Sequence, residues 1–414
     1  MHVLVVTNYF APEGGAAAMR LTRLARKLRQ RGHRVTVLTS LPHYPKGRIY
    51  DGHRGRLWMT TDSDGIRVVQ TWLFATPNPR ISRKLVSQLS FMLSAGLLGL
   101  GLPRPDVLLV EGQPIFTGLA GVLLATVKRR PYVFNVSDLW PEHLLSVGAL
   151  SETDIVYRLA RKLVDTMYRR ASAIVAITPG LADTIAGHVD RPDKVRLIRN
   201  GVDLTVFRPC RRSADTFRQK HGLDGRRIVS FIGTFSTAYD FDLMMQVASR
   251  LGSDERVQIV FIGQGSQEEA FRRHLDTVAN VRWIPWISPH EVPAAWNASD
   301  VTYFALRRHP LYEGTIPAKL YEAMACGVPV VAALEGSGAE LITSSGAGIA
   351  VPCEDAAGLA GALEKMLTDD AAWQRCAAAA RDYAKAHFDA DRVVDAYEQT
   401  LLTAMAPRPA GTGE

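Results

Sequence analysis

Cysteine is scarce in this sequence of 414 residues, occurring only at Cys210, Cys326, Cys353 and Cys376. These positions lie far apart and show neither C-x-x-C nor metal-ligand spacing, which indicates a reducing compartment and argues against disulfides. The first residues, MHVLVVTNYF, lack the basic leader and small-residue cleavage site of an export signal and are typical of a strand. We therefore expect a cytoplasmic protein.

Signatures of nucleic-acid binding are also missing, because the sequence has no RNP, zinc-finger or basic-zipper pattern. The G-x-G-x-x-G spacing of dinucleotide-binding proteins is absent, which argues against NAD or FAD. A D-x-D pattern does occur at Asp62 and Asp64, but TTDSDGIRVV is typical of a turn that Gly65 closes before a strand. We expect no catalytic metal, no cofactor and no nucleic-acid partner.

Acidic residues are sparse in the first half of the chain. Lys and Arg outnumber Asp and Glu by 28 to 14 over residues 1–200, whereas acids outnumber bases by 27 to 21 over residues 201–414. The net charge of +8 therefore combines +14 and -6, and the basic half predicts an anionic partner such as a phosphorylated lipid or a membrane surface. The basic residues that we expect at this surface are Arg20, Arg23, Arg26, Lys27, Arg29, Arg80, Arg83 and Lys84.

One long run carries no charge: residues 85–103, LVSQLSFMLSAGLLGLGLP. A membrane span needs about 20 predominantly apolar residues, and this run contains three serines and Gln88. The alternatives are a buried amphipathic helix and a helix that lies in the membrane interface beside basic residues. We favour the buried helix, because apolar helical runs usually belong to a core.

Short β-rich apolar runs alternate with helical patterns along the chain, which predicts βαβ units and parallel sheets. We predict an α/β protein of two doubly wound, Rossmann-like domains that face each other across a cleft: residues 1–200 and 201–390, with a last helix and a disordered tail over 391–414. The expected strands are HVLVVTN, RVTVLTS, IRVVQTWL, DVLLVEG, YVFNVSD, AIVAITP, KVRLIRNG, RIVSFIG, VQIVFIG, VRWIPW, DVTYFAL, VPVVAA and GIAVP.

Glycine-rich turns follow several of these strands, where the open sheets of α/β proteins bind ligands. Gly14 and Gly15 follow the first strand, and the stretches GTFS (233–236) and GQGS (263–266) follow two strands of the second half. Together with the helix that starts after Thr315, these turns predict three helix N-termini along one sheet edge of the second domain, a suitable lining for a diphosphate. Each turn by itself is equally typical of an ordinary βα connection.

The stretch TIPAKLYEAMACGVPVVA, residues 315–332, places Lys319 and Glu322 on one face of a short helix. A cation near the helix start can neutralise a leaving phosphate, and a carboxylate one turn on can accept two hydrogen bonds from vicinal ribose hydroxyls. The alternative is a surface pair worth a few tenths of a kcal/mol.

Several motifs in order, NGVD, FIGQGS, YEAMACGVPVVA and AGIAVP, resemble the landmarks of the retaining family-four glycosyltransferases, which have the GT-B fold. The resemblance covers nearly the whole chain. The stretches NYFAPEGGAAAMR, GHRVTVLTSLPHYPKG and SDLWPE are similar to the bacterial O-antigen and capsule branch that includes N-acetylfucosaminyl transferases. The resemblance to the family-four glycosyltransferases implies an acceptor-binding first domain, a nucleotide-sugar-binding second domain and a last helix that crosses back to the first domain.

By this resemblance Glu322 matches the second acid of an E-x7-E pattern and would bind the nucleotide ribose. The first acid would fall at Gly314, beside Glu313, which is out of register. The resemblance and the turns together give the candidate donor-binding residues Gly14, Gly15, Gly233, Thr234, Gly263, Gly265, Gly314, Thr315, Ile316 and Glu322.

The family usually places an Arg and a Lys where this chain has Thr234 and Tyr239. The diphosphate would then depend on backbone amides and on Lys319, helped by Arg307 or Arg308.

Asp138 in NVSDLWPEH matches the acid of a His-Asp pair of the family, whose His position is Ser137 here. It would hold the donor sugar or orient the acceptor hydroxyl, and Glu142 is a second candidate or else a solvated carboxylate at a helix start. Asp138, Glu142 and Lys319 are therefore the candidate catalytic residues.

The predicted function is the transfer of a hexose or amino-hexose, with retention, from a UDP-linked donor to an acceptor hydroxyl. The expected acceptor is a lipid-linked glycan of bacterial surface polysaccharide synthesis, reached by peripheral contact with the cytoplasmic face of the inner membrane. The alternatives are a tailoring transferase for a small soluble acceptor, a nucleotide-sugar 2-epimerase and a non-catalytic nucleotide-sugar-binding subunit.

Overall fold

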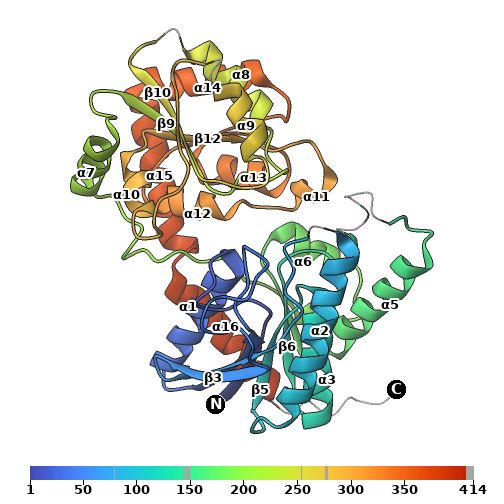
Figure 1. Cartoon of the computed structure of the whole chain (residues 1–414). Coiled ribbons are helices and arrows are strands. Elements are labelled where there is room, and N and C mark those ends of the chain that lie inside the picture. Colours follow the sequence, from blue (N-terminus) through green and yellow to red (C-terminus); the bar gives the residue numbers. More distant parts are fainter. Residues whose placement is uncertain (79, 143–144, 146–149, 253, 276–277, 407–414) are drawn as a thin grey trace. The chain divides into compact units, whose positions relative to one another are not determined.

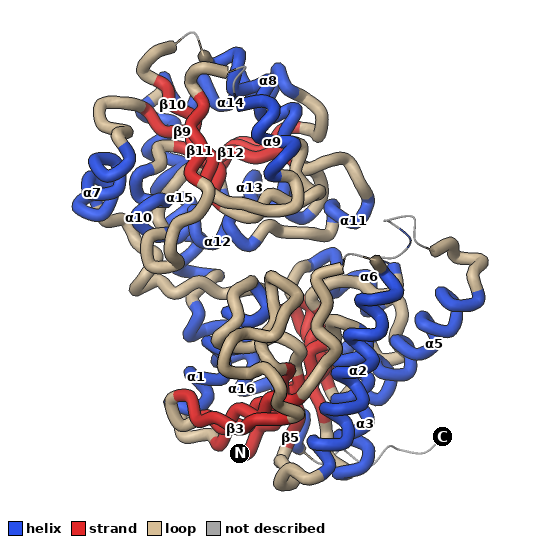
Figure 2. The backbone as a smooth tube through the Cα atoms, in the orientation of Figure 1, coloured by secondary structure: helices blue, strands red, loops and turns tan. Residues whose placement is uncertain are grey.

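The computed structural model describes residues 1–406 except 79, 143–144, 146–149, 253 and 276–277. The chain forms two compact units (Figure 1). The first consists of Met1–Arg199 and the chain from Val393 onward, and the second of Asn200–Arg392. In each unit a sheet lies among helices (Figure 2).

The sheet of the first unit has its strands parallel, apart from β3, which pairs antiparallel with β4. Its order across the sheet is β3 (Trp58–Ser63), β4 (Ile66–Thr71), β2 (Arg34–Ser40), β1 (His2–Val6), β5 (Val107–Glu111), β6 (Tyr132–Val136), β7 (Ala173–Ala176) and β8 (Val195–Leu197). The helices of this unit are α1 (Ala16–Gln30), α2 (Ile81–Leu100), α3 (Ile115–Lys128), α5 (Ile155–Arg170), α6 (Pro179–Ala186) and most of α16 (Ala390–Met405).

Side chains alternate between two layers along the first strand, as the period of a strand requires. Leu4 and Val6 of β1 belong to the core cluster that also contains residues of α2, α3 and α5. Val3 and Val5 point to the opposite face, into the cluster with residues of α1 and α16. The two helix layers therefore cover opposite faces of the first sheet.

The sheet of the second unit is entirely parallel. Its order is β11 (Val281–Ile284), β10 (Val257–Ile262), β9 (Arg227–Ile232), β12 (Val301–Ala305), β13 (Val330–Ala333) and β14 (Gly348–Val351). The helices are α7 (Arg211–His221), α8 (Phe241–Leu251), α9 (Glu268–Leu275), α10 (Val292–Ala298), α11 (Pro310–Glu313), α12 (Ala318–Ala325), α13 (Ser337–Ser345), α14 (Ala356–Thr368) and α15 (Asp370–His387).

The predicted fold class, two Rossmann-like α/β domains, is confirmed. Each expected apolar run forms a strand, whereas the polar strand β3 was not predicted. The D-x-D pattern spans the end of β3 and the turn to β4, and the Asp62 carboxylate accepts a hydrogen bond from the Gly65 amide at 2.9 Å. Asp64 adopts a positive φ of 58° in this turn and pairs with Arg26 at 2.9 Å.

The chain leaves the second unit through α16, which starts at Ala390, and from Val393 onward the helix packs with the first unit. The expected disordered tail lies, from residue 407, outside the described residues.

Helix α2 covers most of residues 85–103 and buries one face, as the preferred interpretation requires, but its other face is not buried. Phe91 and Ala95 of α2 are buried in the core, but a row of leucines on its other side is exposed. No helix among the described residues is long and apolar enough to cross a membrane.

Candidate functional site

Lys319 of α12 has the most unusual environment among the candidate residues. Its Nζ is buried and has no hydrogen-bond partner among the described residues. It lies 3.7 Å from the ring centroid of Phe231 and 4.4 Å from that of Tyr239. Burial lowers the pKa of the Lys319 ammonium to about 7, although the Glu322 carboxylate acts in the opposite direction. The interpretation as a surface Lys/Glu pair is therefore wrong.

Glycine at position 233 makes room for this lysine. A Cβ on Gly233 would lie 2.2 Å from Lys319 Nζ, so any larger residue would displace the ammonium from this position. Because φ of Gly233 is +153°, the position also favours glycine by its backbone conformation. Lys319 therefore lies directly against the turn that follows β9.

Glu322 lies one turn further along α12, half-buried, with its Oε2 accepting a hydrogen bond from Trp296 Nε1 at 3.2 Å. Trp296 of α10 is fully buried and was not predicted as a site residue. Leu320, Ala323 and Met324 of α12 are buried, as the helix pattern predicts. The indole therefore holds one carboxylate oxygen of Glu322 in place.

The amides of the two glycines expected to bind the diphosphate are already hydrogen-bonded within the sheet. The amide of Gly233 donates to Ile262 O at 2.8 Å, and that of Gly263 donates to Ile284 O at 3.0 Å, so neither is available to a ligand. The two turns instead pack on each other: a Cβ on Gly263 would lie 1.9 Å from Gly233 O, and one on Gly265 2.3 Å from Phe235 O. The glycines are required for this close approach.

The turns also lie further from helix starts than expected. Helix α8 begins at Phe241, well after Gly233 and the exposed Thr234, whereas α9 begins at Glu268, shortly after Gly265. Helices α9, α8 and α12 nevertheless come after the neighbouring strands β10, β9 and β12, which agrees with the predicted three helix N-termini along one sheet edge.

The residues before α12 form a bend in which Thr315 is exposed, Gly314 is half-buried and Ile316 is buried. Glu313 is exposed, and a Cβ on Gly336 would lie 2.1 Å from its carbonyl oxygen.

The two arginines expected to assist Lys319 already have acidic neighbours. Arg308 lies 3.4 Å from carboxylate oxygens of both Glu335 and Glu354, and Arg307 lies 3.9 Å from Asp242. Lys319 is therefore the better placed cation.

A buried polar network marks the carboxyl ends of β5 and β6 in the first unit. Glu111 accepts from Arg20 at 2.7 Å, from Ser137 Oγ at 2.7 Å and from Asn135 at 2.9 Å. Tyr397 of α16 donates to Asn135 Oδ1 at 2.6 Å. Burial raises the pKa of Glu111, and the Arg20 charge opposes this rise. The sequence did not reveal this network, and Arg20 is not part of an exposed basic helix face as expected.

Asp138 is exposed next to this network, just after β6. Glu142, in contrast, pairs with Arg161 of α5, which also binds Asp165 at 2.6 Å. Because its side chain is mostly buried in this pair, the interpretation of Glu142 as a solvated carboxylate is wrong. The pair also makes a proton-transfer role less suitable for Glu142 than for Asp138.

Glu13 is a buried acid beside the predicted Gly14–Gly15 turn and was missed. Its Oε1 accepts hydrogen bonds from the amides of His43 at 2.7 Å and Tyr44 at 2.8 Å. Burial raises its pKa to about 7, although these hydrogen bonds act to lower it. The signal in the sequence was an acid between Pro12 and the glycine pair, directly after the first strand.

The two glycines differ in their surroundings. Gly15 precedes α1 with φ of +107°, and a Cβ there would lie 3.2 Å from the Tyr44 ring, whereas Gly14 has open space around it. The residues that the structure describes contain no group of three acidic, His or Cys side chains that could hold a metal ion.

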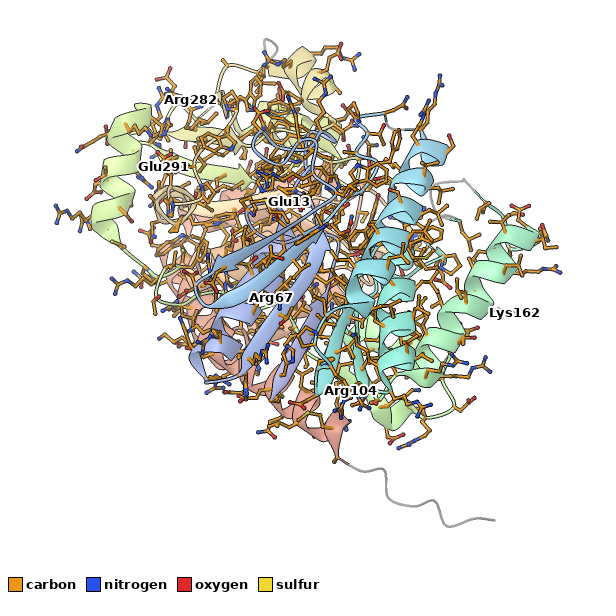
Figure 3. All side chains as sticks on the ribbon, turned by 60° about the horizontal axis from the view of Figure 1, so that its bottom comes forward. Glu13, Arg67, Arg104, Lys162, Arg282 and Glu291 are labelled. Atoms are coloured by element: carbon orange, nitrogen blue, oxygen red, sulfur yellow. The ribbon has the colours of Figure 1, made fainter. Side chains whose placement is uncertain are left out.

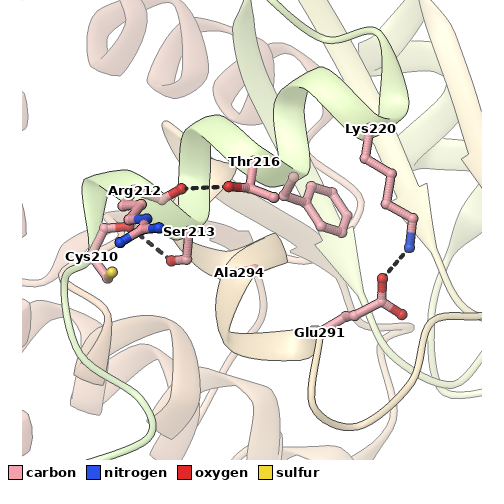
Figure 4. A pocket seen from close by; sticks show the side chains of 8 residues that line it. Cys210, Arg212, Ser213, Thr216, Lys220, Glu291 and Ala294 are labelled. Atoms are coloured by element: carbon pink, nitrogen blue, oxygen red, sulfur yellow. Dashed lines mark hydrogen bonds and ion pairs between the residues drawn. The ribbon is translucent and has the colours of Figure 1, made fainter.

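A separate pocket of about 350 Å³ lies where α7 packs on α10 (Figure 4). The ion pair of Lys220 and Glu291 lies at its edge, and Cys210 and Ser213 line it (Figure 4). None of the candidate site residues lines this pocket.

Comparison with known families assigns both units. Residues 15–201 match the glycosyl transferase 4-like domain, and residues 213–383 match the glycosyl transferases of group 1. The chain is a glycosyltransferase of the GT-B fold. Lys319, Glu322 and the turns at Gly233 and Gly263 lie in the group 1 region of this glycosyltransferase.

Two curated relatives show how far the sequence similarity extends. The glycosyltransferase is 27% identical over 269 residues to the probable glycosyltransferase WbjE of Pseudomonas aeruginosa, which covers 64% of this chain and 66% of that protein. It is 26% identical over 366 residues to a GDP-mannose-dependent alpha-mannosyltransferase of Mycolicibacterium smegmatis, with 84% of each chain covered.

Solved structures support the fold. The glycosyltransferase superposes on HepE of Anabaena in complex with UDP-glucose with a TM-score of 0.72 and 18% identity, covering 97% of this chain and all of that one. The TM-score with sucrose-phosphate synthase of Thermosynechococcus elongatus is 0.75, at 16% identity and with coverage of 96% and 97%.

Proposed function

We propose that this glycosyltransferase moves a hexose or amino-hexose from a UDP-linked donor to an acceptor hydroxyl with retention of configuration. The observation that carries the proposal is the buried Nζ of Lys319, which lies against Gly233 and the rings of Phe231 and Tyr239 and has no hydrogen-bond partner among the described residues. A cation buried without a polar partner is costly, so we expect an anion to complete the site. A diphosphate supplies that charge.

Glu322 supports the assignment of the nucleoside. Trp296 orients the carboxylate by its hydrogen bond to Oε2, and a carboxylate has the acceptor geometry that the two vicinal hydroxyls of a ribose require. Lys319 and Glu322 lie on the same face of α12, so the diphosphate and ribose of one nucleotide can reach both. The complex of HepE with UDP-glucose makes UDP the first donor to test.

The proposed reaction needs no protein nucleophile. The bond between the anomeric carbon and the diphosphate oxygen breaks, and the acceptor oxygen bonds to the same face of the sugar. The acceptor proton passes to the leaving diphosphate. Lys319 then stabilises the charge that grows on the diphosphate, and Asp138 orients the acceptor hydroxyl.

We propose a lipid-linked glycan of bacterial surface polysaccharide synthesis as the acceptor. The excess of basic residues over positions 1–200 favours an anionic carrier, such as a lipid diphosphate. The motifs NYFAPEGGAAAMR and SDLWPE support the O-antigen and capsule branch, including its N-acetylfucosaminyl transferases.

A panel of UDP-, GDP- and dTDP-linked sugars with a detergent-soluble lipid-linked acceptor tests the proposal. We expect transfer from a UDP-sugar, and NMR of the product should show the anomeric configuration of the donor. Inverted product, or interconversion of UDP-N-acetylhexosamines without any acceptor, would contradict it. Lys319→Met serves as the matched inactive control, and Lys365→Met, at an exposed position of α14, as the active one.

A further inference from the structure

The outer side of α2 carries a continuous row of exposed apolar side chains. Val86, Leu89, Leu93, Leu97 and Leu100 follow each other at spacings of three and four residues, which places them on one helix face. Leu93 is 60% exposed and Leu97 is 73% exposed. Single exposed leucines are common on proteins, but a row along a whole helix marks an interaction surface.

The row continues onto α3, which packs beside α2 (Figure 1). Leu123 and Val127 of α3 are more than half exposed. A Cβ on Gly96 of α2 would lie 3.6 Å from Leu123, and one on Gly99 2.6 Å from Leu124, so the glycines bring the two helices close together. The five residues of α2 together with Leu123 and Val127 form one surface, called here the α2–α3 face.

Charge around the α2–α3 face has a single sign. No acidic residue occurs over residues 80–105, which include all of α2. Arg83 and Lys84 are exposed at the start of α2. At its other end lies Arg104 (Figure 3), which donates to the carbonyl of Lys128. The residue after Lys128, Arg129, is exposed.

Helix α5, which packs on α3, also exposes apolar residues beside cations, although acidic Asp154 precedes it and Asp165 lies within it. Ile155 and Leu159 of α5 are exposed, with Arg158 and Lys162 next to them in the helix. The labelled Lys162 points away from the sheet into solvent (Figure 3). The combination of an apolar stripe with flanking cations extends over this helix layer.

We propose that the α2–α3 face docks this glycosyltransferase on an anionic lipid bilayer, with α2 lying in the headgroup region. Leucines would enter the boundary of the acyl chains, and Arg83, Lys84 and Arg129 would meet lipid phosphates. A protein partner would require acidic counterparts for these cations, which a second copy of this face does not offer. Charge complementarity therefore selects the anionic lipid.

This inference goes beyond the transfer reaction, because it uses no residue of the candidate site. It also corrects the expectation that the basic residues of α1 act together with Arg80, Arg83 and Lys84 at the start of α2. Helix α1 packs on the opposite face of the first sheet from α2, so its arginines cannot contact the same membrane plane. The α1 arginines therefore provide a matched control.

Co-sedimentation of the whole protein with phosphatidylglycerol and with phosphatidylcholine vesicles tests the proposal. We expect binding to the anionic vesicles at low salt, weaker binding at high salt and little binding to the neutral vesicles. The double variant Leu93→Gln/Leu97→Gln and the variant Arg83→Glu/Lys84→Glu should each lower the partition coefficient by about tenfold or more. Leu402→Gln and Arg26→Glu/Arg29→Glu, on the opposite layer, should bind like the wild type.

Equal binding of the face variants and their controls would overturn the proposal, as would binding without any preference for anionic lipid. Light scattering without lipid tests whether the α2–α3 face is a dimer interface instead. If the wild type is a dimer and Leu93→Gln/Leu97→Gln is a monomer, the face binds a second copy of the chain and not a membrane. Circular dichroism confirms that each variant is folded. Because vesicle binding is read without donor or acceptor, its failure is distinct from a failure of the proposed transfer reaction.

Discussion

Lys319 Nζ lies 3.7 Å from the ring centroid of Phe231, on the strand that precedes the Gly233 turn. The ring of Tyr239, a position where the sequence resemblance led us to expect a lysine, lies 4.4 Å from the same ammonium. The cation of this chain therefore comes from α12, and the aromatic ring at 239 supports it. Two aromatic faces attract a cation but offer it no lone-pair acceptor, so the N–H groups of the ammonium still lack the acceptors that an anion would supply.

Replacing Lys319 should affect turnover more than nucleotide affinity. We expect Lys319→Met to lower kcat by about 100-fold or more, the usual loss for one donor to a developing negative charge, with a smaller change in the Kd of UDP. Lys319→Arg should recover part of the activity. Steady-state kinetics and calorimetry measure the two quantities, and an equal loss in both would contradict a role specific to the transition state.

UDP binding should take up a proton at Lys319. Because its pKa is about 7 in the free protein, Lys319 is mostly neutral at pH 8, and a bound diphosphate would raise that pKa. We expect uptake of close to one proton at pH 8 and an affinity that falls as the pH rises above 7. Calorimetry in two buffers of different ionisation enthalpy measures the uptake. The groups that titrate nearby, Glu322 and Tyr239, remain in Lys319→Met, which should bind UDP without proton uptake.

Glu322 should distinguish ribose from its deoxygenated analogue. Hydrogen bonds to a charged group are worth about 1.5–3 kcal/mol, so the wild type should bind UDP at least tenfold more tightly than 2′,3′-dideoxy-UDP. Glu322→Ala should bind the two equally, with an affinity close to that of the wild type for the analogue. Continued preference of Glu322→Ala for UDP would reject the ribose assignment.

The strands could be predicted because those of parallel sheets are buried on both faces and form continuous apolar runs. Strand β3, WMTTDS, has no such run, since it lies at the sheet edge with half of its residues exposed. The motif around Lys319 was visible, but its burial depends on Phe231, Gly233 and Tyr239, which the fold brings from another part of the chain.

The amides of Gly233 and Gly263 were predicted to bind phosphate, but both are already used within the protein. A glycine that follows a strand occurs in phosphate-binding turns and also in turns that pack closely on each other, and the sequence looks the same in both cases. Their hydrogen bonds to Ile262 and Ile284 continue the sheet beyond the assigned strands. Which of the two roles such a glycine has depends on the register of neighbouring strands, and a single sequence does not contain that information.

Glu13 should make the first unit less stable as the pH rises. Its pKa is about 7 in the folded protein against an ordinary value of 4.5, so the folded state holds more protons between these values. We expect a loss on the order of 3 kcal/mol from pH 4.5 to above 7 in the wild type relative to Glu13→Gln. Because His43 Nδ1 lies 3.3 Å from Glu13 Oε1, the same comparison is repeated in a His43→Gln background, where this imidazole cannot contribute. A difference that does not vary with pH would contradict the raised pKa.

The two acids after β6 should separate into a catalytic and a structural residue. Asp138 is exposed, so Asp138→Asn should leave the free energy of unfolding nearly unchanged while lowering kcat by about 100-fold or more. Glu142 binds Arg161 in a largely buried pair, so Glu142→Gln should instead cost about 1–3 kcal/mol of stability, with a small effect on kcat at a temperature where it is folded. Urea unfolding and initial rates on the same preparations measure both quantities. If Glu142→Gln were fully folded and inactive while Asp138→Asn kept its activity, the roles of the two acids would have to be exchanged.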